Sequence, residues 1–340
     1  MSEHGQIKKA LLRELSENSR ISITDLAKKL KCSRNAAIDN IKLLEQEFGL
    51  KYTLQFGDDP YVPIRNQIIT VKFRVKPKDS VIRAMFKNSK YVSFVAITEG
   101  DFDLLIHMVT DSVGEYTRWA FLTFSKLYDY GPLARPSIID FVHMGFMPIP
   151  DADLSESKMK QFGTIDDLDK KLLLLLNNES KLSDSALSKK AGENVDTVRK
   201  RTKRLLRSEI IKKYTAILSK PPAYQYNIAF FINYRFCPDI ADSYTKLKGY
   251  YTELDEKSQL INPFQYIATT NGSYSLFGIG CFRDEETAIT GAVLAHKEIF
   301  KAADVEISYA KIREVVYGNL PIRNIDIRKE FRPIAVGSAK

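Results

Sequence analysis

Hydrophobic and polar positions follow a pattern that occurs twice along the chain. Each copy opens with apolar residues at helical spacing: Ile7, Leu11 and Leu15 in the first, Leu168, Leu172 and Leu175 in the second. A short and then a longer amphipathic segment follow, and each copy ends on an extended stretch, residues 51–54 and 213–216. Three helices followed by a strand predict a winged helix-turn-helix, whose third helix has the shape to enter a DNA major groove.

The segment after each of these units repeats as well. Residues 66–75 and 225–236 alternate apolar and polar positions, as half-buried strands do. A helix-like stretch, a strand, a turn, a strand, a long helix and a last strand follow in both copies. This βαββαβ order predicts an antiparallel sheet with two helices on one face, a ferredoxin-like sandwich.

We therefore predict an α+β chain in which a winged helix-turn-helix plus a ferredoxin-like sandwich is repeated in tandem. The predicted domains are a first helix-turn-helix at 1–60, a first sandwich at 61–150, a second helix-turn-helix at 164–220 and a second sandwich at 221–325. The predicted joint is residues 148–163, a polar segment rich in loop formers. Because such sandwiches pair through sheet faces or edges, we expect an intramolecular pair, or a homodimer of four sandwiches.

Net charge is confined to the two helical units. The 340-residue chain carries +9. Residues 1–56 carry +3 of it, residues 164–220 carry +6, and the rest of the chain is neutral. A localised basic footprint predicts a polyanion partner such as double-stranded DNA. The alternative is a set of solvated Lys and Arg side chains on helix surfaces, and the pattern shared by both basic segments favours the nucleic acid.

The second helical unit carries the clearest family resemblance. Its landmarks are Leu168-Asp169 at the start, Ala186-Leu187, the stretch 201–206, and Ile211 followed by Tyr214-Thr215-Ala216. These residues resemble the opening of the Lrp/AsnC (feast/famine) transcriptional regulators, and the likeness covers nearly the whole chain, twice. The resemblance implies a DNA-binding regulator whose ACT/RAM-like sandwich takes a small effector such as an amino acid.

The third helix of the second unit supplies most of the predicted DNA contacts. Its apolar side should pack inward, and its opposite side carries long basic residues. Because residues near the start of a recognition helix usually read bases, the predicted base contacts are Asn194, Thr197, Lys200 and Arg201. The predicted backbone contacts are Arg204 and Arg207, flanked by Arg199 and Lys203.

The third helix of the first unit is less basic. Asp39 stands where Lys200 stands in the second copy, and phosphate repels a carboxylate. The predicted DNA contacts here are Ser33, Arg34, Asn35 and Lys42. The alternative is that this unit binds DNA weakly or makes a dimer or protein contact. In either case the footprint on DNA should not be a perfect palindrome.

Two glycine turns are the candidate effector site. The sandwich signature of the family is a Thr-Gly-x-aromatic-Asp turn, approximated here in both halves, with Ser275 replacing the acid in the second. In the functional interpretation, backbone amides near the glycines hold a small carboxylate between the sandwiches. The candidate residues are Thr98, Gly100, Asp103, Thr270, Gly272 and Tyr274. The alternative is that Gly100 and Gly272 serve only the turn, since glycine is the default residue at positive φ.

Enzyme chemistry is not indicated by any motif. The chain has no phosphate-loop pattern, its three cysteines show no C-x-x-C spacing, and its four histidines are far apart in sequence. We therefore predict no catalytic residue, metal site or cofactor. Two alternatives stay open: a sirohaem decarboxylase-like enzyme on the same scaffold, and an architectural or protein-bridging module.

Two further expectations concern location and core. The longest apolar run, residues 172–176, is far short of the roughly 20 residues needed to cross a bilayer. Together with the scattered cysteines, this predicts a cytoplasmic protein with no membrane partner. Aromatic residues at helical spacing predict part of the sandwich core: Trp119, Phe121, Phe124 and Tyr128.

Overall fold

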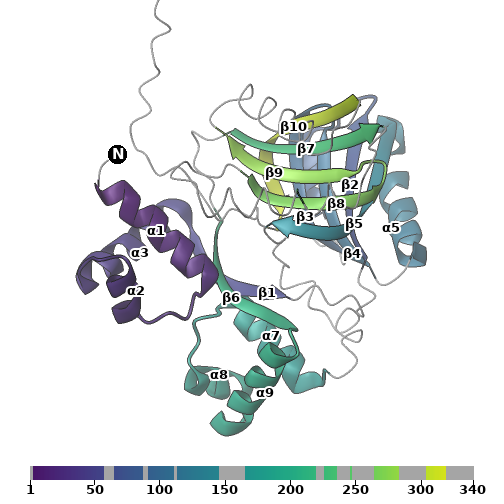
Figure 1. The fold of residues 1–340 in the computed structure, drawn as a ribbon. Coiled ribbons are helices and arrows are strands. Elements are labelled where there is room, and N and C mark those ends of the chain that lie inside the picture. The colour runs from purple at the N-terminus through teal and green to yellow at the C-terminus, as the bar shows by residue number, and fades with distance from the viewer. Residues whose placement is uncertain are drawn as a thin grey trace, which may run out of the picture.

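The computed structural model is an α+β structure with two helical units beside a sheet (Figure 1). It describes residues 3–56, 65–86, 91–110, 113–144, 165–219, 226–235, 246, 264–282 and 304–318. The predicted joint at 148–163 lies outside the described residues. So do the stretches 236–245, 247–263 and 283–303, which lie between the strands of the second predicted sandwich.

Each helical unit contains three helices. They are α1 (Glu3–Glu17), α2 (Ile23–Lys29) and α3 (Arg34–Phe48) in the first, and α7 (Asp167–Asn178), α8 (Asp184–Ala191) and α9 (Val195–Arg207) in the second. Polar residues cap them: Ser22, Ser33, Asp166, Ser183 and Asn194 each accept a hydrogen bond from a backbone N–H of the first turn. Such caps are worth about 1 kcal/mol each, which explains why these short helices begin where they do.

The strand after each unit pairs with its counterpart from the other unit. β1 (Leu50–Phe56) and β6 (Ile211–Leu218) run antiparallel, with Thr53 opposite Thr215. Because these two residues are equivalent in the repeat, the ribbon has local two-fold symmetry. The first helices are exchanged over it, since α1 packs on β6 and α7 packs on β1. The three helices of both units and this ribbon therefore form one body, called the head below.

Contacts on the two-fold axis tie the head together further. The hydroxyls of Ser19 and Ser180 lie 2.6 Å apart. Arg20 donates to the carbonyls of Ser180 and Leu182 at 2.6 and 2.8 Å, and its guanidinium lies 4.0 Å from the centre of the Tyr214 ring. In α7, the first helix of the second unit, the buried leucines are Leu172, Leu173 and Leu176. Leu175, which the sequence pattern placed on the apolar side, is only half-buried. The core position shifts because this helix packs on both β1 and α9.

Eight strands close into a barrel in the order β10-β3-β4-β2-β5-β8-β9-β7. The first half supplies β2 (Arg65–Phe73), β3 (Val92–Gly100), β4 (Leu104–Thr110) and β5 (Pro132–Met144). The second supplies β7 (Tyr226–Arg235), β8 (Phe264–Gly272), β9 (Leu276–Phe282) and β10 (Asp304–Tyr317). Both halves use the same internal order, and they join where β5 pairs with β8 and β10 with β3. We call these two junctions the seam. The two sheets thus pair within one chain.

The barrel encloses an aromatic core, and helices cover part of its outside. Phe231 packs against Phe102, Tyr274 and Phe277, with ring centres 5.5, 4.3 and 4.8 Å apart. Outside, α4 (Asp79–Phe86) and α5 (Val113–Ser125) cover a second apolar cluster on the first half, as Figure 1 shows for α5.

Part of the aromatic prediction was wrong. Trp119 is buried and Phe124 packs against its ring, but Phe121 and Tyr128 are 73% and 81% exposed. The helix ends at Ser125, and Tyr128 lies in the following 3-10 turn, so helical spacing no longer applies there. Within the described part of the chain, no helix is long and apolar enough to cross a membrane.

Candidate DNA-binding head and seam cavity

Helix α9 is anchored by a buried carboxylate on α7. Asp169 is fully buried, and its Oδ2 lies 3.3 Å from Arg201 Nη1 and in contact with Arg204 Nη2. Asp166, the cap of α7, pairs with Arg201 at 2.6 Å. Hydrogen bonds from the Asp169 amide and from Arg201 hold the pKa of the Asp166 carboxyl below its usual range. Two arginines predicted to touch DNA thus first fix the recognition helix to its own unit.

The rest of the exposed α9 face is cationic. The predicted inward side is confirmed for Val198, Thr202 and Leu205, which are buried. Lys200, Lys203, Arg204 and Arg207 line one shallow hollow on the opposite side, with Ser208 at its end. The helix carries six basic residues and one acidic residue. Long basic side chains displayed on one helix face suit a phosphate backbone.

The first turn of α9 is partly occupied by contacts within the protein. Asn194 is the helix cap, and its Oδ1 accepts from the Asp196 amide at 2.8 Å. Arg199 pairs with Asp184 and Asp196 at 3.1 and 3.2 Å. In the first unit Ser33 caps α3 in the same way, with its Oγ 3.1 Å from the Ala36 amide. Thr197 and Lys200 are therefore the residues best placed for base contacts, and all of these assignments remain predictions.

Helix α3 presents a different face. It carries Arg34 and Lys42 against three acidic residues, and the exposed Asp39 occupies the position of Lys200. The ion pair between the first and third helices has the opposite polarity here: Lys8 of α1 supplies the cation and Glu47 of α3 the acid, 3.9 Å apart. Asn35 and Lys42 are exposed, as predicted contacts must be, but the surrounding charge is nearly balanced.

The two glycine turns lie at the seam. Gly100 is paired with Ala310 of β10, and a Cβ added to Gly100 would lie 2.7 Å from the Tyr309 carbonyl oxygen. Gly272 is paired with Ser137 of β5 in the equivalent junction. Their φ angles are +144° and +133°. Both glycines thus allow one half of the chain to approach the other closely.

The amides of these turns are already hydrogen-bonded. Asp101 N donates to Tyr309 O at 3.0 Å, and Ser273 N donates to Pro136 O at 3.2 Å. Asp103 N and Ser275 N donate to carbonyls of β2 and β7. Two of these four amides bond across the seam and two bond within their own half, so none of the four is free to hold a carboxylate. The effector assignment of the turns stays a prediction. Thr98 and Thr270 likewise close their own turns, donating to Phe102 O and Tyr274 O at 2.8 and 2.9 Å.

Asp103 also has a structural role. It is buried, its Oδ2 accepts from the Phe73 amide at 2.9 Å, and its Oδ1 lies 3.5 Å from both Lys72 and Lys76. Of the six candidate effector residues, Tyr274 lines a cavity between the two halves. Asp101 and Phe102 of the cavity belong to the first glycine turn. Sequence reasoning missed the remaining residues, since they come from four strands and carry no motif.

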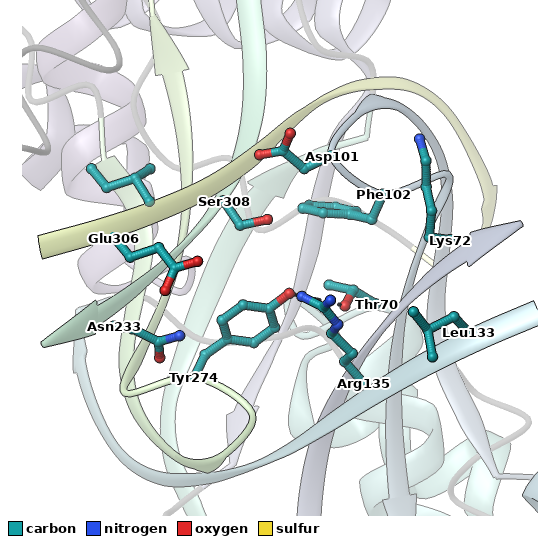
Figure 2. Close-up of a pocket in the computed structure, with 11 residues that line it drawn as sticks. Thr70, Lys72, Asp101, Phe102, Leu133, Arg135, Asn233, Tyr274, Glu306 and Ser308 are labelled. Atoms are coloured by element: carbon teal, nitrogen blue, oxygen red, sulfur yellow. Dashed lines mark hydrogen bonds between the residues drawn. The ribbon is translucent and has the colours of Figure 1, made fainter. Parts of the chain in front are cut away.

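This seam cavity has a volume of about 380 Å³ and lies between the two halves (Figure 2). Its wall includes the turn aromatics Phe102 and Tyr274 and polar residues of both halves: Thr70, Lys72, Arg135 and Asn233. The size is within the range of small-ligand sites. Among the described residues, no group of three or more His, Cys, Asp or Glu side chains is arranged to hold a metal ion.

Comparison with known proteins supports the helical unit and the overall fold. Residues 6–47 match the family model described as winged helix-turn-helix DNA-binding. The HTH-type transcriptional regulator FL11 of Pyrococcus furiosus is 41% identical over 70 residues. That match covers 21% of this chain and 46% of the regulator, so it spans less than half of the relative. A winged helix-turn-helix of DNA-binding type is thus present at the start of the chain.

Most of the chain superposes on a solved enzyme. The crystal structure of the siroheme decarboxylase NirDL superposes with a TM-score of 0.57 over 93% of this chain and 94% of that one. Its complex with an iron-uroporphyrin III analogue gives a TM-score of 0.56 over 92% and 93%. Sequence identity is 10% in both cases, so the likeness concerns the fold alone.

Proposed function

We propose that the protein is a sequence-specific, double-stranded DNA-binding transcription regulator of the Lrp/AsnC type. The observation that carries this proposal is the outward face of α9, where Lys200, Lys203 and Arg207 lie together on an anchored helix. The winged helix-turn-helix match at 6–47 and the likeness to the regulator FL11 support it.

In this proposal the chain is a fused tandem of two winged helix-turn-helix units, 1–60 and 164–220, and two ferredoxin-like sandwiches, 61–150 and 221–325. The equal strand order of the two halves and the symmetric β1–β6 ribbon support it. Because the sandwiches already pair within one chain, a homodimer would bring four helical units together. A small ligand such as an amino acid would tune DNA binding from the barrel.

The experiment is a genome-wide map of bound sites, followed by anisotropy titrations of the purified protein on the recovered fragments. We expect affinity well above that for random DNA and a steep fall with salt. Equal affinity for selected and random fragments would reject sequence-specific regulation, and no binding at low salt would reject DNA as a partner.

A second candidate, an enzyme resembling the siroheme decarboxylases, is favoured by the fold shared with NirDL. The seam cavity itself, at about 380 Å³, is small for a polycarboxylated tetrapyrrole. Incubation of the purified protein with sirohaem, with product analysis by mass spectrometry, decides the matter. Loss of carbon dioxide from sirohaem would replace the regulator proposal with the enzyme.

A third candidate assigns protein bridging to the first unit, which the near-neutral face of α3 favours. DNA footprinting separates it from a two-headed regulator. Protection by both units would exclude bridging by the first, whereas protection by the second unit alone would support it.

A further inference from the structure

A turn of the first helical unit contacts the second unit through Arg20. This arginine lies between α1 and α2, and its Nε and Nη2 donate to the carbonyls of Ser180 and Leu182 at 2.6 and 2.8 Å. Both carbonyls belong to the segment that enters α8. The guanidinium also lies 4.0 Å from the centre of the Tyr214 ring on β6. One side chain of the first unit therefore holds the entry to α8 against β6, as the planar fork of an arginine allows.

The first residue of α8 links this contact to the recognition helix. That residue is Asp184, whose Oδ1 lies 4.0 Å from Arg20 Nη1. Its Oδ2 lies 3.1 Å from Arg199 Nε on α9. Arg199 directly precedes Lys200 and follows Thr197 by two positions, so it lies among the predicted base contacts. We call Arg20, Asp184 and Arg199 the arginine bridge.

A stacking contact also exists in the opposite direction. Lys181 is the equivalent of Arg20 in the repeat, and its Nζ lies 3.8 Å from the centre of the Tyr52 ring. Tyr52 is the equivalent of Tyr214, and its hydroxyl donates to Glu45 of α3 at 3.0 Å. A cation of each unit therefore lies over a tyrosine on the strand of the other unit.

The ionic part of the contact differs between the two directions. Counted from the helix caps, Ile23 and Ile38 occupy in the first unit the positions of Asp184 and Arg199. Because isoleucine carries no charge, these two positions cannot link Lys181 to the start of α3. The arginine bridge therefore leads from the first unit to α9, the more basic of the two recognition helices, and has no equivalent at these positions of α2 and α3.

We propose that Arg20 is a positioning residue for α9, so that the base preference of the second unit depends on a side chain of the first. Arg20 fixes the start of α8, and Asp184 fixes Arg199 beside Thr197 and Lys200. A base contact needs placement within about 0.5 Å, whereas a lysine on a flexible stem can follow a phosphate. Loss of Arg20 should therefore reduce base discrimination more than overall affinity. This inference rests on the proposed DNA-binding function.

The test compares Arg20→Gln with Lys181→Gln in the full chain, using a DNA library randomised over the bound site. We expect Arg20→Gln to reduce base discrimination about tenfold in the half-site that Thr197→Ala also alters, with affinity for random DNA within about twofold. Lys181→Gln removes the equivalent cation and should leave that half-site unchanged. Unchanged discrimination in Arg20→Gln, or an equal loss in Lys181→Gln, would overturn the proposal.

A second substitution tests whether the bridge acts as one unit. Asp184→Asn removes its middle charge and leaves the hydrogen bonds from Arg20 to the two carbonyls in place. The double variant Arg20→Gln/Asp184→Asn should lose no more discrimination than the larger of the single losses, because two breaks in one chain of contacts are not independent. Fully additive losses would show that the two residues act separately, and would reject the bridge.

Hydrogen exchange in the absence of DNA separates this inference from the proposed function. The amides of Leu187 and Val198 donate to the cap carbonyls that begin α8 and α9. Both amides should exchange several-fold faster in Arg20→Gln than in Lys181→Gln, since only the first loses the bridge. Equal exchange in the two variants would reject the positioning role. A wild-type protein that binds selected and random DNA equally would instead reject the proposed function, and the exchange rates would still decide the role of Arg20.

Discussion

The carboxylate of Asp169 on α7 binds the guanidinium of Arg204 on α9, and the Asp169 side chain is fully buried. The arginine is 44% exposed, so the pair joins the core of the second helical unit to its outer face. Arg201 is held by the same carboxylate oxygen. One buried acid of α7 therefore binds two arginines of α9.

Replacing this acid should destabilise the head. In Asp169→Asn, Arg204 loses its counter-ion and Arg201 keeps only its pair with Asp166. We expect a loss of about 1–3 kcal/mol, at the lower end because both arginines are partly exposed. Thermal unfolding followed by circular dichroism measures this loss. Asp167→Asn is the control, since Asp167 is exposed and bonds only Lys170 among the described residues. Equal melting temperatures for the two variants would contradict an anchoring role for Asp169.

The DNA interface should depend on Lys200 and Lys203. Removing both in Lys200→Ala/Lys203→Ala eliminates two cations that have no ion pair among the described residues. The slope of log affinity against log salt should fall by about two, because each phosphate contact accounts for roughly 0.9. Anisotropy titrations at several salt concentrations measure it. Lys126→Ala, a change of an exposed lysine beyond α5, provides the comparison. A slope unaltered by the double substitution would remove α9 from the interface.

The negative charge of Asp39 on α3 should limit what the first helical unit contributes to DNA affinity. Asp39 occupies the position of Lys200, so Asp39→Lys makes the two faces more alike. We expect tighter binding to random DNA and a salt slope larger by about one. Asp39→Asn should give a smaller gain, which separates repulsion from a new contact. If neither variant changes DNA affinity, the first unit faces away from the duplex and the bridging role gains support.

Local patterns predicted the helical elements, because the information lies within a few residues. Helix α9 is the predicted third helix of the second unit, and Val198 and Leu205 on its apolar side are buried. Asn194, predicted as a base contact, is the cap of this helix. The exchange of first helices could not be predicted in this way. It depends on the pairing of Thr53 with Thr215, which lie far apart in sequence and carry no signal for each other.

The candidate site was only partly predictable for the same reason. The periodic pattern placed Arg201 and Arg204 on the outer face of α9, but it could not show that Asp169 of another helix binds them. The glycine turns were found from their spacing, yet the amides of Asp101 and Ser273 donate to strands of the opposite half. Arg135 lies on an ordinary strand, and only the closed barrel makes it part of a cavity.

Low pH should lower the stability of the head by protonating Asp166. Its pKa is lowered in the folded state, so its stabilising contribution is complete above the ordinary value of about 3.9 and is lost as pH falls through the lowered pKa. We expect the wild-type melting temperature to fall more steeply below pH 4 than that of Asp166→Asn, which has no proton to gain. Melting curves from pH 7 to pH 2.5 test this. Parallel curves for the two proteins would show that Asp166 contributes nothing to acid sensitivity.

The seam should tolerate no side chain at Gly100. An added Cβ would lie 2.7 Å from the Tyr309 oxygen and 2.9 Å from the Ala310 Cα, and both atoms belong to the backbone of β10. Because backbone cannot rotate away, Gly100→Ala must separate β3 from β10. We expect a loss of more than about 2 kcal/mol, as overpacking adds to the cost of positive φ.

Gly192→Ala is the matched control, since Gly192 also has positive φ but has nothing within 4 Å of its added Cβ. It should cost only the backbone strain, about 1 kcal/mol. Urea unfolding of both variants gives the comparison, and equal losses would mean that the two halves are not pressed together at this turn.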